Sequence, residues 1–114
     1  MYIESYSFGS MTVDGETYDK DLIIFPDKLK SGWWRKEGHS LTIEDLVDVV
    51  TYRPHTLIVG RGASSCMDVP ASTKQALERQ GIAVVEVSTY EAVELFNERI
   101  EEGEKVAGAF HLTC

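Results

Sequence analysis

The stretch Thr56-Leu57-Ile58-Val59-Gly60-Arg61-Gly62-Ala63-Ser64-Ser65-Cys66 decides how this chain folds. Its first residues form a short, apolar and largely β-branched run, which is typical of a buried strand. The run ends at two glycines on either side of Arg61, and small polar residues and a cysteine follow. This change predicts a strand that delivers a glycine-rich turn, a guanidinium and a thiol to one edge of a sheet.

The sequence after this stretch predicts alternating helices and strands. Proline is tolerated in a first helical turn, and glycine suits the residue just past a helix. A near-continuous apolar run is typical of a strand covered on both faces. The expected elements are a helix from Asp68 and Pro70 to Gly81, a strand over 82–87, a helix capped by Ser88 with Glu91 and closed by Gly103, and a strand over 106–112.

The first third of the chain predicts antiparallel strands. Asp14-Gly15 is a strong hairpin signal, because both turn positions favour a positive φ. Strands are expected over 2–8, 11–13, 16–18 and 22–25, followed by a loop over 26–41 in which 33–35 could form a further short strand. A helix is expected from Thr42, an N-cap with Asp45 in reach, until Pro54 stops it.

Length and composition indicate one α/β domain over residues 1–114. A chain of 114 residues with 43% hydrophobic residues can bury one core but not two. Strand–helix–strand order with right-handed connections favours an open parallel arrangement, to which the N-terminal strands add antiparallel pairs. We therefore expect a mixed sheet with helices.

The charge balance restricts the partners. A net charge of −8 argues against nucleic-acid binding, which requires clustered lysines and arginines. The sequence shows neither a secretory signal nor an apolar run long enough for a membrane span. Two cysteines form no disulfide framework, which favours a reduced, cytoplasmic protein. We expect a monomer or a weak homo-oligomer.

Several motifs together carry a family resemblance. They are Asp14-Gly15, Trp34, Leu57-Ile58-Val59-Gly60-x-Gly62, Thr89-x-x-Ala92-Val93-x-x-Phe96-Asn97 and the segment 106–114. The combination resembles the small α/β family that includes the mitochondrial complex I assembly factor three and an adipogenesis-associated protein. The resemblance implies a three-layer fold, with a central mixed sheet, helices and an extra N-terminal β layer. It implies no settled reaction, cofactor or active-site residue.

The glycine-rich turn is a candidate anion or partner site. Ligands of open α/β sheets bind beyond the carboxyl ends of the strands, where exposed amides attract anions. Arg61 could grip a carboxylate or phosphate through two hydrogen bonds. The dinucleotide fingerprint fails at Ser65, and the lysine of a phosphate loop is missing. The candidate residues in this turn are Gly60, Arg61, Gly62, Ser64, Ser65 and Cys66; the alternative is that the glycines only turn the chain.

Cys66 is the candidate nucleophile of a rival, enzymatic interpretation. A nearby helix start and Arg61 would favour its thiolate, and His39 or His111 would have to serve as the base. His111 and Cys114 could join Cys66 and His39 in a tetrahedral zinc site, but residues three apart on a strand point to opposite faces. We expect no metal and no cofactor.

Two adjacent tryptophans mark a second candidate surface. In extended structure, Trp33 and Trp34 face opposite ways, so one can anchor the core while the other stays exposed. An exposed tryptophan beside Arg35 and His39 is typical of a protein-binding hot spot. The sequence thus favours a non-enzymatic interaction or assembly module with an unknown protein partner or small anionic ligand. The alternative is a small enzyme or anion-binding protein that uses Arg61 and Cys66.

Overall fold

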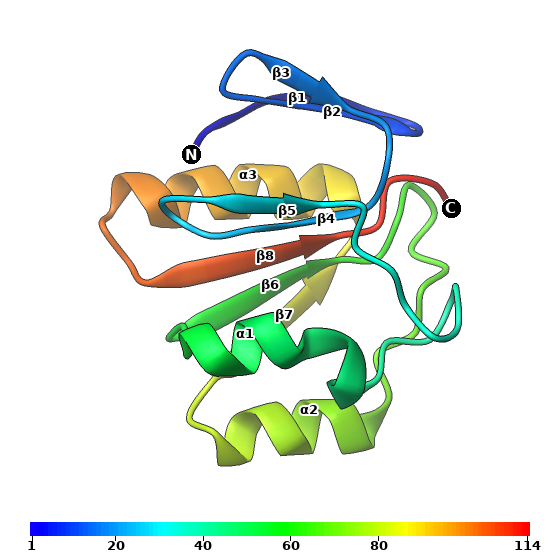
Figure 1. Cartoon of the computed structure of the whole chain (residues 1–114), viewed down its shortest axis with the longest axis vertical. Helices are drawn as coiled ribbons and strands as arrows, with labels where there is room; N and C mark the ends of the chain where they lie inside the picture. Colours follow the sequence, from blue (N-terminus) through cyan, green and yellow to red (C-terminus); the bar gives the residue numbers. More distant parts are fainter.

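The chain forms two sheets and a set of helices arranged in layers (Figure 1). This computed structural model describes residues 1–114. The elements in chain order are β1 (Ile3–Ser7), β2 (Ser10–Val13), β3 (Glu16–Tyr18), β4 (Leu22–Ile24), β5 (Leu29–Ser31), the 3₁₀ helix η1 (Ile43–Leu46), α1 (Val47–Tyr52), β6 (Thr56–Gly60), α2 (Ala71–Arg79), β7 (Ala83–Val87), α3 (Thr89–Glu101) and β8 (Val106–Phe110).

The main sheet is mixed, as the sequence predicts. Its strand order is β5-β4-β8-β6-β7. β6 runs parallel to both β7 and β8, whereas β4 runs antiparallel to both β8 and β5. The small sheet has the order β1-β2-β3 and is antiparallel throughout. The last strand of the chain therefore lies at the centre of the main sheet.

Alternating side chains divide the core between the two faces of the main sheet. On β6, Leu57 and Val59 belong to a buried cluster that also contains residues of α1 and α2. Ile58, between them, belongs to a second cluster with residues of α3 and the small sheet. Figure 1 shows α1 and α2 on one side of the sheet and α3 with the small sheet on the other. The expected three-layer architecture, including the extra N-terminal β layer, is confirmed.

Local signals explain several boundaries. Asp14 and Gly15 have φ angles of 49° and 82°, as a tight hairpin between β2 and β3 requires. The Asp45 carboxylate accepts a hydrogen bond from the Thr42 amide at 3.0 Å, which caps η1. The Ser88 hydroxyl accepts from the Glu91 amide at 3.3 Å and caps α3.

Other boundaries differ from the sequence predictions. The helix after Thr42 starts as 3₁₀ turns, and α2 starts at Ala71 with Pro70 as its N-cap. The short strand falls at Leu29–Ser31 rather than 33–35, because it pairs with β4 across a hairpin. β7 lies at one edge of the sheet, and its residues are exposed or half-buried. Val84 packs on one core cluster and Val85 and Val87 on the other, so both faces of β7 are partly covered. β8 ends at Phe110, so His111 and Cys114 follow the strand rather than belonging to it.

None of the helices combines the length and the apolar composition that crossing a bilayer requires.

Candidate functional site

The Gly60–Cys66 turn leaves the carboxyl end of β6, as the sequence predicts, but residues 113–114 cover it. Gly62 has a φ of 104°, and a Cβ there would lie 2.4 Å from the Cys114 carbonyl carbon. The Ala63 amide donates to the Thr113 carbonyl at 2.7 Å, and the Cys66 amide donates to the Cys114 carbonyl at 2.9 Å. Gly62 is therefore required for the close approach of the two segments, whose backbones are hydrogen-bonded to each other.

Arg61 and the Gly62 amide are also bonded within the chain. The Arg61 Nε donates to the Met67 carbonyl at 2.7 Å, which holds the half-buried side chain along its own loop. The Gly62 amide donates to the Thr89 hydroxyl at 2.9 Å, and that hydroxyl donates to the His111 carbonyl at 2.6 Å. These groups, expected to face an anion, instead fix the start of α3 against the turn.

The remaining residues of the turn are more accessible. Ser64 and Cys66 are exposed, and Ser65 is half-buried with a φ of 55°. The Cys66 thiol lies 3.9 Å from the Ser64 carbonyl, and no imidazole contacts it. The structure thus brings neither His39 nor His111 to Cys66.

His111 instead belongs to a buried polar network with Arg35 and Asp21. The Asp21 carboxylate lies 2.8 Å from the Arg35 Nη1 and 2.8 Å from the His111 Nδ1. Its second oxygen accepts a hydrogen bond from the Leu112 amide at 2.8 Å. Arg35 and His111 are 8% and 5% exposed, so both polar groups depend on these partners.

The network keeps Asp21 ionised and determines which ring nitrogen of His111 carries a proton. Burial on its own would raise the pKa of Asp21, but hydrogen bonds from His111, the Leu112 amide and Arg35, together with the Arg35 charge, hold that pKa below its usual value. The Nδ1 of His111 is also 3.1 Å from Arg35 Nη2. The shorter contact to the carboxylate assigns the proton to Nδ1, and Nη2 donates to the Gly38 carbonyl at 3.0 Å. The network joins residues 35–38 to the end of β8.

His39 lies next to this network. Its ring stands edge-on to the His111 ring at 5.8 Å, and its Nε2 is 3.8 Å from the Cys114 sulfur. Both cysteines are free thiols. No group of three or more histidine, cysteine or acidic side chains is placed to hold a metal ion.

The two tryptophans face opposite ways. Trp33 is buried, and its indole nitrogen donates to the Asp45 carbonyl at 2.9 Å. Trp34 is 76% exposed. Trp34 borders a surface hollow of about 520 Å³ between residues 30–36 and the start of α1. The structure thus makes Trp34 accessible and uses Trp33 for packing.

Asp21 is the site residue that sequence reasoning missed. It follows Asp19 and Lys20 at the end of a polar turn, and nothing local distinguishes it from its exposed neighbours. Its position directly before the buried strand β4 is the only sequence signal, because such residues lie at the end of a sheet.

Comparison with known proteins identifies the family. A model described as "Protein of unknown function (DUF498/DUF598)" matches residues 3–111. The structure is similar to that of a conserved hypothetical protein from Pyrococcus horikoshii, with 26% identity over 100% of both chains and a TM-score of 0.85. It is also similar to a protein from Rhodopseudomonas palustris, with 27% identity over 95% of this chain and 80% of that one, and a TM-score of 0.76.

A Mth938-like domain from Bordetella pertussis shares the fold, with a TM-score of 0.81 over 97% of this chain and 85% of that one at 17% identity. The motifs from Asp14-Gly15 to the last strand therefore reflect true family membership. The chain belongs to the DUF498/DUF598 family, which includes the mitochondrial complex I assembly factor three and the adipogenesis-associated protein.

Proposed function

We propose that the chain is a non-enzymatic protein-interaction module of the cytoplasm and that Trp34 is the centre of its contact surface. One observation carries this proposal: Trp34 is 76% exposed, although the residues on both sides of it, Trp33 and Arg35, are buried. Leaving an indole in water forgoes a large hydrophobic stabilisation. Tryptophan is also the residue type that most often anchors a protein interface.

The backbone that carries Trp34 is held on both sides. The Trp33 amide donates to the Asp21 carbonyl at 2.8 Å. The Lys36 amide donates to the Asp45 carboxylate at 3.1 Å. Because this backbone is already ordered, docking of the indole costs little conformational entropy, which favours binding.

The surroundings of Trp34 indicate the chemistry of the partner. Val47, which is 63% exposed, lines the same hollow. Two ion pairs border it, Lys30–Asp48 at 2.6 Å and Lys36–Glu44 at 3.6 Å. This surface suits a protein with an apolar pocket for the indole and a rim that carries both signs of charge.

The Gly60–Cys66 turn can extend this surface. The segment 39–41 runs beside 67–68, since the Asp68 amide donates to the His39 carbonyl at 2.7 Å and the Leu41 amide donates to the Asp68 carbonyl at 2.9 Å. Ser64 and Cys66 are exposed and come just before residues 67–68 in the chain. They therefore lie on a loop that is hydrogen-bonded to the segment after the tryptophans. We include them in the proposed contact region.

Quantitative affinity capture from the native host tests this function. The bait is the whole chain, compared with Trp34→Ser and with Phe8→Ser as the matched control, since Phe8 is a 62% exposed aromatic residue between β1 and β2. We expect Trp34→Ser to lose the enriched partner and Phe8→Ser to retain it, with both variants as stable as the parent. Equal enrichment with all three baits would refute the assignment of the surface.

A further inference from the structure

The only two cysteines of the chain, Cys66 and Cys114, are neighbours in the fold. The Cys66 amide donates to the Cys114 carbonyl at 2.9 Å, and the Ala63 amide donates to the Thr113 carbonyl at 2.7 Å. A hydrogen bond of this length, with standard bond lengths on either side of it, places the two cysteine Cα atoms roughly 5–6 Å apart. Cysteines joined by a disulfide have their Cα atoms about 4.4–6.8 Å apart, so this backbone is already within the range of a disulfide.

The fold itself holds the two segments together. A Cβ at Gly62 would lie 2.4 Å from the Cys114 carbonyl carbon, so glycine is needed for the turn to come this near. The His111 amide donates to the Gly60 carbonyl at 2.9 Å, which aligns residues 111–114 with the turn. Both thiols are free, so their proximity does not depend on a bond between them.

Both thiols reach the surface, and one of them can turn. Cys66 is exposed and Cys114 is half-buried. The two sulfurs lie against different groups: the Cys66 Sγ is 3.9 Å from the Ser64 carbonyl, and the Cys114 Sγ is 3.8 Å from the His39 Nε2. Joining them requires a new side-chain rotamer, which an exposed cysteine can adopt without displacing packed atoms.

His39 gives the two thiols different roles. An imidazole that contacts a thiol can take up its proton, and the thiolate is the form that attacks a disulfide. Cys114 has such a neighbour in the exposed His39, whereas no imidazole contacts Cys66. The arrangement therefore favours Cys114 as the attacking thiol and Cys66 as the thiol that closes the bond.

We propose that Cys66 and Cys114 form a reversible disulfide by exchange with a small-molecule disulfide of the glutathione type. Disulfides of cytosolic proteins are mostly transient and respond to the redox state of the compartment. This bond would fasten residues 113–114 to the turn that follows β6. The proposal is independent of the Trp34 surface, because the exchange needs no protein partner.

The exchange proceeds in two displacements. The Cys114 thiol passes its proton to His39, and its sulfur attacks one sulfur of glutathione disulfide, whose S–S bond breaks. The first glutathione leaves as a thiolate and takes the proton from His39. The Cys66 sulfur then attacks the Cys114 sulfur and displaces the second glutathione, which leaves with the Cys66 proton. Two protein thiols are oxidised, and one glutathione disulfide is reduced to two thiols.

A redox titration of the whole chain tests the proposal. The protein is equilibrated at graded ratios of glutathione to glutathione disulfide, quenched with acid and alkylated, and its remaining thiols are counted by intact mass. We expect both thiols to disappear together within one chain. The equilibrium constant should be at least roughly 30-fold larger for the folded chain than for the chain unfolded in urea, because a disulfide that the fold favours stabilises the fold by the same factor. Thiols that persist at every ratio, a disulfide that forms only between chains, or an equal constant in urea would each overturn the proposal.

Three variants test the order of attack. Cys66→Ser lacks the closing thiol and should accumulate glutathione on Cys114, faster than Cys114→Ser accumulates it on Cys66. His39→Gln should slow the reaction roughly tenfold and leave the equilibrium constant unchanged, since an unassisted thiol is only a few per cent thiolate at neutral pH. His55→Gln is the matched control, because His55 is exposed and precedes β6 at the opposite end of that strand. Equal rates for His39→Gln and His55→Gln would refute the role of His39.

Discussion

Replacing Asp21 with asparagine is expected to destabilise the protein strongly at neutral pH. The variant keeps the size of the side chain and an oxygen for the Leu112 amide, but an NH2 donor replaces the charged oxygen that faces His111 and Arg35. The Arg35 side chain, 5% exposed, then loses the only carboxylate that it contacts. Leaving a buried charge without its partner costs roughly 3–5 kcal/mol. Arg35 keeps the Gly38 carbonyl, which accepts from its Nε and Nη2, so we expect a loss near the lower limit, about 3 kcal/mol.

The pH dependence gives this prediction its specific signature. The pKa of Asp21 is lower in the folded than in the unfolded chain, so its ionised form stabilises the fold. That stabilisation is complete above the unfolded pKa of about 3.9 and is lost as the pH falls through the folded pKa. The Asp21→Asn variant lacks this group, so the stability gap between parent and variant should be constant from pH 7 to 5 and narrow below about pH 4.

Urea unfolding at 25 °C, followed by tryptophan fluorescence at pH 7, 5, 4 and 3, measures this gap. The control is Asp19→Asn two residues earlier, at an exposed position, where we expect a change within about 0.5 kcal/mol. A loss below about 1 kcal/mol for Asp21→Asn at pH 7 would contradict the assigned energy of the network. A gap that is as large at pH 3 as at pH 7 would contradict its electrostatic origin.

Two further substitutions test how the chain ends are fixed, each by the same urea assay. Gly62→Ala should lower the free energy of unfolding by about 3 kcal/mol, because of left-handed backbone strain and the lost contacts with Cys114. The control is Gly103→Ala, which has a φ of 75° and open space around it, so it reports the backbone strain alone. An equal loss in both variants would refute the steric argument. Asn97→Ala should cost about 2 kcal/mol, because Asn97 both accepts from the Ile3 amide at 2.9 Å and donates to the Ile3 carbonyl at 2.8 Å. A loss below about 0.5 kcal/mol would show that β1 does not depend on this side chain.

Local sequence signals were sufficient for most elements of the fold. The hairpin at Asp14-Gly15 and the cap at Ser88 depend on neighbouring residues only, and both are present. The edge position of β7 could not be predicted, because an apolar run has the same appearance in a central strand and in an edge strand that helices partly cover. Strand order depends on pairing between distant segments, and β4 pairs with β8 across more than 80 residues.

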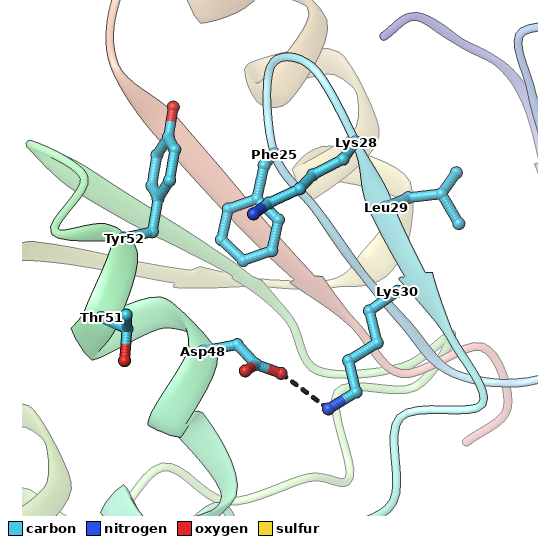
Figure 2. Close-up of a pocket in the computed structure, with 7 residues that line it drawn as sticks. All are labelled: Phe25, Lys28, Leu29, Lys30, Asp48, Thr51 and Tyr52. Carbon is cyan, nitrogen blue, oxygen red and sulfur yellow. Dashed lines mark hydrogen bonds and ion pairs between the residues drawn. The ribbon is translucent and has the colours of Figure 1, made fainter.

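In the candidate site too, features set by neighbouring residues were predicted, whereas contacts between distant segments were not. The expectation that one of the two adjacent tryptophans is buried and the other exposed is confirmed, with Trp33 buried and Trp34 exposed. The link between Asp21 and His111 spans 90 residues, and the cover that Cys114 forms over Gly62 spans about half the chain. Neither has a local pattern. The hollow between the β4–β5 hairpin and the end of α1 (Figure 2) also forms only where two distant segments meet, so its lysines look like ordinary surface residues in the sequence. Its lining residues are Phe25, Lys28, Leu29, Lys30, Asp48, Thr51 and Tyr52.

The central position of β8 also has a consequence for biogenesis. During synthesis β4, β5, β6 and β7 are all made before β8, yet β8 separates β4 from β6. Until β8 is made, β4 and β6 lack the partner with which Ile23 and Ile58 pair in the folded sheet, although both strands are strongly apolar. Closure of the sheet must wait for residues 106–110, so a ribosome stalled before them would present a chain that needs a chaperone.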